Sequence, residues 1–98
     1  MKHSINKKAL KQLYQAFSQI RSPEEAEEFL QDICTPNELQ AMADRWFVVK
    51  PIKDEMPYRD IYELTGVSVT TIGRVARVIR TGRGGYDTIY KRVGDKNE

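Results

Sequence analysis

Two helix-start signals of the same design stand in the first half of the chain, and they constrain its fold more than any other feature. Residues 22–25 read Ser-Pro-Glu-Glu and residues 35–38 read Thr-Pro-Asn-Glu. In each run a hydroxyl residue suits the N-cap, proline suits the first turn, and acids suit the positive end of the helix dipole. Glu38 follows Thr35 at the spacing of a capping box. The signals predict helices that begin directly after Ser22 and Thr35.

Apolar residues recur at steps of three and four along most of the chain, which is the pattern of amphipathic helices. No strand pattern competes with it. We expect six helices, at about residues 4–20, 23–33, 36–50, 57–64, 69–80 and 86–93. The third should end near Lys50, because Pro51 disfavours helical geometry in the residue before it. In the fourth, Ile61 and Leu64 should face the core.

The rarest residue types exclude several classes of protein. Cys34 is the single cysteine and His3 the single histidine, so neither a disulfide scaffold nor a zinc site with Cys/His spacing is expected. No apolar run is long enough to cross a membrane, and the basic start lacks the apolar segment of a secretory signal. We expect a cytoplasmic protein without metal or cofactor. Because paired catalytic groups are missing as well, an enzyme is not expected.

The net charge of +2 hides an uneven distribution. Residues 64–86 contain four arginines and no acid. Contact with a polyanion is local, since salt screens charges that are more than about 10 Å apart. The stretch therefore favours binding to nucleic acid, although a few arginines more often mark a solvated helix face.

Residues 58–75 have the pattern of a helix-turn-helix unit. Gly66 allows a left-handed turn between two helices, Val67 fills the angle between them, and Ser68 caps the second helix. That second helix would enter the major groove of DNA. Tyr62 stands where such units usually hold a small residue, so either it points outward or the two helices spread slightly. The alternative is an ordinary helical hairpin.

The expected DNA contacts lie on and around this second helix. Side chains near its N-terminus would meet base edges, and the cations around them would bind phosphates. The expected contacts are Lys53, Arg59, Ser68, Val69, Thr70, Thr71, Gly73, Arg74, Arg77 and Arg80. For Gly73, close approach of the DNA backbone and close packing between helices remain equal alternatives.

Arginines recur at every third position from residue 74 to residue 83. Three residues turn a helix through about 300°, so the row slants around the surface and not all four arginines can face one partner. Arg77 and Arg80 are the better phosphate candidates, together with Arg59 and Lys53.

The chain resembles the Trp repressor superfamily, most of all its YerC/YecD branch. The resemblance rests on residues 35–45, on Met56 and Arg59, and on residues 66–74, which read Gly-Val-Ser-Val-Thr-Thr-Ile-Gly-Arg. It implies a six-helix, all-α protomer and an intertwined dimer, in which the N-terminal helices of two chains share one core. Large apolar residues crowd the first fifty positions, and a monomer would expose them unless its own core takes them all. They are Tyr14, Phe17, Phe29, Met42, Trp46 and Phe47.

The resemblance also implies a ligand pocket, because the co-repressor indole of the Trp repressor lies between two arginines. Those arginines match Arg45 and Arg74 here, and a threonine close to the ligand matches Thr35. Val75 and Val78 stand where the repressor keeps a small residue and a small hydroxyl residue. Tryptophan is therefore not expected to bind, since a branched side chain would crowd the slot. In the alternative, Arg45 is structural and pairs with an acid.

We therefore expect a single helical domain over residues 1–93 and a mobile tail at 94–98. Within the domain, residues 1–50 would form the core and dimerisation helices, 57–80 the helix-turn-helix unit and 86–93 the C-terminal helix. The favoured function is a sequence-specific DNA-binding transcriptional regulator, a repressor that acts as a homodimer. The alternative is a helical protein-interaction or dimerisation module in which the helix-turn-helix is scaffold only. Such a module would carry an acidic or apolar outer face on the second helix.

Overall fold

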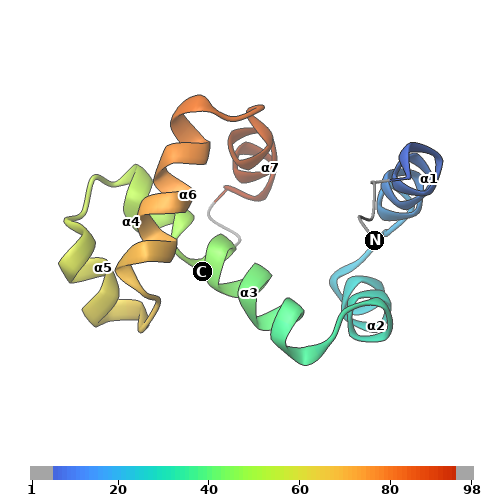
Figure 1. The fold of residues 1–98 in the computed structure, drawn as a ribbon, viewed down its shortest axis with the longest axis horizontal. Coiled ribbons are helices and arrows are strands. Elements are labelled where there is room, and N and C mark those ends of the chain that lie inside the picture. Colours follow the sequence, from blue (N-terminus) through green and yellow to red (C-terminus); the bar gives the residue numbers. More distant parts are fainter. Residues whose placement is uncertain (1–5, 95–98) are drawn as a thin grey trace, which may run out of the picture. The chain divides into compact units, whose positions relative to one another are not determined.

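The computed structural model describes residues 6–94, which form helices joined by short turns (Figure 1). In chain order these are α1 (Lys7–Phe17), α2 (Pro23–Ile33), α3 (Pro36–Phe47), α4 (Val49–Lys53), α5 (Tyr58–Thr65), α6 (Val69–Thr81) and α7 (Gly85–Val93). The predicted all-α fold is confirmed. His3, the start of the first expected helix and residues 95–98 of the expected tail lie outside the described residues. No helix within residues 6–94 is long and apolar enough to cross a membrane.

The chain divides into two compact units, an N-terminal unit that ends at Leu39 and a C-terminal unit that begins at Gln40. In the N-terminal unit, α1 begins at Asn6, whose side chain accepts a hydrogen bond from the backbone N–H of Ala9 at 3.0 Å. The rings of Phe17 and Phe29 meet edge to face, with their centroids 5.6 Å apart. This aromatic contact holds α1 against α2.

Both predicted helix-start signals act as caps. The Ser22 hydroxyl accepts a hydrogen bond from the backbone N–H of Glu25 at 3.1 Å. At α3 the Thr35 hydroxyl accepts from the N–H of Glu38 at 3.1 Å, and the Glu38 carboxylate accepts from the N–H of Thr35 at 2.8 Å. This reciprocal pair is a capping box, as the spacing predicted.

The predicted end of the third helix near Lys50 is wrong. α3 ends at Phe47, Val48 is a turn residue with φ −89° and ψ −3°, and α4 then runs from Val49 to Lys53 with Pro51 inside it. Pro51 is the third residue of α4, where a backbone N–H would have no partner within the helix. The proline therefore costs α4 no hydrogen bond.

The C-terminal unit is built around α6, which packs against α4, α5 and α7 (Figure 1). Its core contains six aliphatic side chains that are at most 4% exposed: Val48, Val49, Ile61, Val67, Ile72 and Val75. Ile61 is fully buried, as expected, but Leu64 is 68% exposed. The expectation for Leu64 is wrong, because Ile61 is the one residue of α5 that is buried and Leu64 lies on the exposed side of this helix. Tyr62 is 50% exposed and points outward, which is the first of its two predicted alternatives.

The first three helices differ from this core in one respect, since none of them contains a buried residue. Their apolar residues nevertheless follow helical spacing. Four of the large side chains expected to need cover are exposed: Tyr14, Phe17, Met42 and Phe47. Phe29 and Trp46 are half-buried. That residues 1–93 form a single domain stays a prediction.

Candidate nucleic-acid interface

The turn between α5 and α6 is fixed by the residues that the pattern singled out. Gly66 ends α5 with φ +76°, a left-handed conformation that favours glycine. Val67 is 4% exposed in the core. The Ser68 hydroxyl accepts a hydrogen bond from the backbone N–H of Thr71 at 3.1 Å and so caps α6. The two helices are therefore held in the arrangement that the helix-turn-helix pattern predicted.

The turn has one support that the sequence reasoning missed. The Thr65 hydroxyl donates to the carbonyl of Ile61 at 2.7 Å and accepts from the N–H of Val67 at 3.1 Å. One hydroxyl thus ties the last turn of α5 to the residue that enters the core. A threonine just before the turn glycine is the signal that could have shown it.

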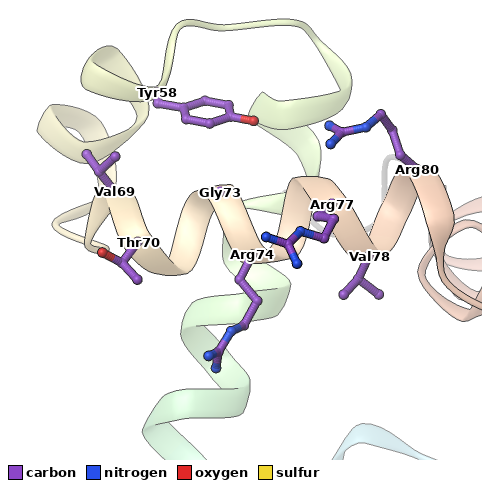
Figure 2. Close-up of a pocket in the computed structure, with 8 residues that line it drawn as sticks. All are labelled: Tyr58, Val69, Thr70, Gly73, Arg74, Arg77, Val78 and Arg80. Atoms are coloured by element: carbon purple, nitrogen blue, oxygen red, sulfur yellow. The ribbon is translucent and has the colours of Figure 1, made fainter.

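The outer side of α6 forms a shallow depression of about 900 Å³, which we call the α6 surface (Figure 2). Its lining residues are Tyr58, Val69, Thr70, Gly73, Arg74, Arg77, Val78 and Arg80. Six of the ten expected DNA contacts belong to it. Three of these are arginines, and the lining contains no acid, so the surface suits an anionic partner.

The slant of the arginine row explains which of its members share this surface. A step of three residues moves a side chain about 60° around the helix, so Arg74, Arg77 and Arg80 span about a third of its circumference. All three line the α6 surface. Arg83 follows the end of α6 at Thr81 and lines a different depression.

Four expected contacts do not line the α6 surface. Ser68 and Thr71 form the cap of α6, with their hydroxyl oxygens 3.1 Å apart. Arg59 is exposed in the first turn of α5 and makes no ion pair with a described residue. Lys53 contacts two residues of α7, Asp87 and Tyr90.

The Lys53 ammonium forms an ion pair with the carboxylate of Asp87 and lies 5.5 Å from the ring centroid of Tyr90. Its hydrogen bond to Asp87 holds the pKa of that carboxyl below its usual value. Both contacts join the end of α4 to α7. Lys53 therefore contributes to the packing of α7, and its contact with phosphate stays a prediction. Asp87 was not singled out by sequence reasoning, because its partner lies on another helix.

Gly73 is packed against a neighbouring helix. A Cβ built on it would lie 3.8 Å from Cε2 of Tyr58, which is ordinary van der Waals contact. A methyl group would therefore fit at this position without displacing the ring, so packing does not require glycine there, and both alternatives for Gly73 stay predictions. Tyr58 itself was missed by sequence reasoning, and a glycine on the outer face of α6 is the signal that a neighbouring side chain lies over it.

The residues expected to form a ligand pocket differ in their surroundings, and the pocket stays a prediction. Thr35 is used by the cap of α3. Val75 is 1% exposed in the core beside Ile72. Val78 and Arg74 line the α6 surface, but Arg45 does not. Arg45 is half-buried and makes no ion pair with any described residue, so the acid partner expected in the alternative is not found there.

A second depression lies between the end of α6 and α7 and is mostly apolar. Its lining residues are Trp46, Val78, Gly82, Arg83, Gly85, Tyr86 and Ile89. The rings of Trp46 and Tyr86 are nearly parallel, at 9°, with their centroids 6.5 Å apart. Tyr90 meets the same tryptophan edge to face at 6.3 Å. These aromatic contacts anchor α7 on the C-terminal unit. No group of three or more His, Cys, Asp or Glu residues in the described part of the chain could hold a metal ion.

Comparison with known proteins agrees with this geometry. The family model described as Trp repressor protein matches residues 8–94. The chain belongs to the Trp repressor family. YerC of Bacillus subtilis (strain 168), which is described as uncharacterized, is 35% identical over 86 residues, which are 88% of this chain and 83% of YerC.

Two solved structures extend the likeness to three dimensions. The crystal structure of a TrpR like protein from Eubacterium eligens ATCC 27750 has a TM-score of 0.82 and 39% identity, over 90% of this chain and 91% of that one. A structure from Staphylococcus aureus has a TM-score of 0.81 and 36% identity, over 87% and 85% of the two chains. The Trp repressor family consists of non-enzymatic regulators that bind DNA through a helix-turn-helix unit.

Proposed function

We propose that this chain is a sequence-specific transcriptional repressor that acts in the cytoplasm as a homodimer and places α6 in the major groove. The observation that carries the proposal is the α6 surface, which gathers three arginines and no acid on the outer side of the second helix of the unit. Val69 and Thr70 lie in its first turn, which is the part of such a helix that meets base edges. Arg77 and Arg80 lie further along, where they would bind phosphates.

The homodimer is supported by the first three helices. Their apolar residues follow helical spacing, yet none of α1, α2 and α3 buries a residue. Amphipathic helices gain most of their stability from packing of the apolar face, so this surface needs cover. A second copy of the same chain supplies an identical set of helices. A dimer would also present two recognition helices to two half-sites.

Sedimentation equilibrium at micromolar concentration is expected to give about twice the chain mass of 11.4 kDa. Met42→Asp places a charge on the exposed apolar side of α3 and should yield a monomer. Tyr62→Asp is the control, because Tyr62 is also exposed but lies on α5. A monomeric wild-type protein, or equal effects of both variants, would contradict the dimer.

Binding to double-stranded DNA is tested with a duplex enriched from a randomised library and with the same duplex after shuffling. The enriched duplex should bind more tightly. Arg59, Arg77 and Arg80 of two protomers would neutralise about six phosphates, so the log–log slope of affinity against salt should be on the order of −5. A flat response to salt, or equal affinity for the two duplexes and for heparin, would favour the scaffold function instead.

Free L-tryptophan is not expected to bind or to tighten DNA binding. Val75, which stands where the repressor keeps a small residue, is 1% exposed and packs in the core. Opening a slot for an indole there would cost about 1–3 kcal/mol, as in overpacked cores, which lowers affinity by a factor of roughly 5 to 150. Isothermal titration calorimetry measures this directly. Saturable binding below about a millimolar, at about −4 kcal/mol or better, together with tighter DNA binding, would restore a tryptophan-dependent repressor.

A further inference from the structure

Tyr58 belongs to the first helix of the helix-turn-helix unit but lines the surface of the second. It begins α5, and 40% of it is exposed. Its Cε2 atom lies 3.8 Å from the position that a Cβ of Gly73 would occupy. The ring therefore lies within van der Waals reach of α6 at position 73.

Figure 2 shows that the α6 surface has two sides. The ring of Tyr58 lies along α6, and its hydroxyl is directed toward the end of the surface where Arg80 lies. Arg74 and Val78 extend from the opposite side of α6. We call the pair Tyr58 and Arg80 the Tyr58 edge.

The chemistry of this edge suits one strand of a DNA backbone. The Tyr58 hydroxyl has no hydrogen-bond partner among the described residues. A phenol hydroxyl is a neutral hydrogen-bond donor, and the Arg80 guanidinium supplies a positive charge at the same end of the surface. Tyrosine hydroxyls and arginines are both common donors to phosphate oxygens.

We propose that Tyr58 is a further DNA-binding residue, whose hydroxyl donates a hydrogen bond to a phosphate on the same backbone strand that Arg80 contacts. This inference rests on the DNA-binding function proposed above. The contact positions α6 and does not read sequence, because Tyr58 lies beside the helix and not at its N-terminal turn, where Val69 and Thr70 lie.

The role of the hydroxyl is tested with Tyr58→Phe, which keeps the ring over Gly73 and removes one oxygen. Affinity for DNA should fall by about 10-fold or more, since each protomer of a dimer loses a hydrogen bond to a charged group. The loss should be equal for the enriched and the shuffled duplex. The salt slope should not change, because a neutral donor releases no counterion.

Two variants serve as references. Tyr62→Phe changes a tyrosine of the same helix that is 50% exposed but does not line the α6 surface, and it should leave affinity unchanged. Arg80→Ala should lower affinity and make the salt slope less steep by about 2, one phosphate for each protomer. Circular dichroism confirms that each variant keeps its helices.

The outcomes separate this inference from the function on which it rests. If the wild-type protein does not bind DNA, the proposed function is wrong. If the wild type binds and Tyr58→Phe changes affinity less than twofold, alters the salt slope, or acts no differently from Tyr62→Phe, only the role of Tyr58 is wrong. A loss confined to the enriched duplex would overturn the phosphate contact, because it would place the hydroxyl on a base.

Discussion

Replacing Arg77 with alanine is expected to lower DNA affinity by at least about 100-fold near 0.1 M salt, the largest loss of any single substitution in the α6 surface. Arg77 lies between Arg74 and Arg80 around the helix, so it faces the partner most directly. A hydrogen bond between charged groups contributes about 1.5–3 kcal/mol, and a dimer loses two of them. The log–log salt slope should become less steep by about 2.

The matched control is Arg83→Ala, which removes the next arginine of the same row. Arg83 lies beyond the end of α6 and lines the apolar depression with Trp46 and Tyr86. It should change DNA affinity by less than about threefold, which is what a distant exposed charge contributes. Electrophoretic mobility shift or fluorescence anisotropy titrations over a salt series measure both variants. Equal losses would mean that only total positive charge matters and that α6 has no defined binding surface.

Thr70→Ala completes the comparison with Arg77→Ala. Thr70 lies in the first turn of α6 and lines the α6 surface, where its hydroxyl or methyl group can contact a base. Its loss should reduce the preference for the enriched over the shuffled duplex more than it reduces affinity. Similar behaviour of the two variants would show that the base and phosphate roles are wrongly assigned.

The local parts of the fold were predictable because their causes lie within a few residues. Ser22 and Thr35 cap helices through bonds to the third residue that follows, and Gly66 takes the left-handed turn conformation. Such capping signals determine where a helix begins, regardless of which other elements pack against that helix. The end of α3 was not predictable in this way. Pro51 can interrupt a helix or occupy its first turn, and only the buried positions of Val48 and Val49 settle which occurs.

The candidate site was predictable along α6 and not across helices. Helical spacing alone placed Arg77 and Arg80 on an outer face. The pairing of Lys53 with Asp87 of α7 was not predictable, because that contact joins helices that are far apart in the sequence. Tyr58 was missed for the same reason, since its position over Gly73 depends on the angle between α5 and α6.

Ile61→Ala is expected to lower the free energy of unfolding by about 2–5 kcal/mol, while Leu64→Ala should change it by about 0.5 kcal/mol or less. Both residues lie on α5 and are similar in size. Ile61 is 0% exposed in the core formed with Ile72 and Val75, whereas Leu64 is 68% exposed. Truncating Ile61 leaves a cavity between α5 and α6, and truncating Leu64 removes surface that water already contacts.

The loss at Ile61 is large compared with the about 5–15 kcal/mol that stabilise a typical domain. Because the core of the C-terminal unit is small, the cavity should also loosen α6 and weaken DNA binding, whereas Leu64→Ala should bind DNA as the wild type does. Urea titrations followed by circular dichroism must be run at one protein concentration, since a dimer gains stability by mass action. A loss at Leu64 as large as that at Ile61 would show that Leu64 is covered in solution, and the surface buried in the proposed homodimer would then have to extend onto α5.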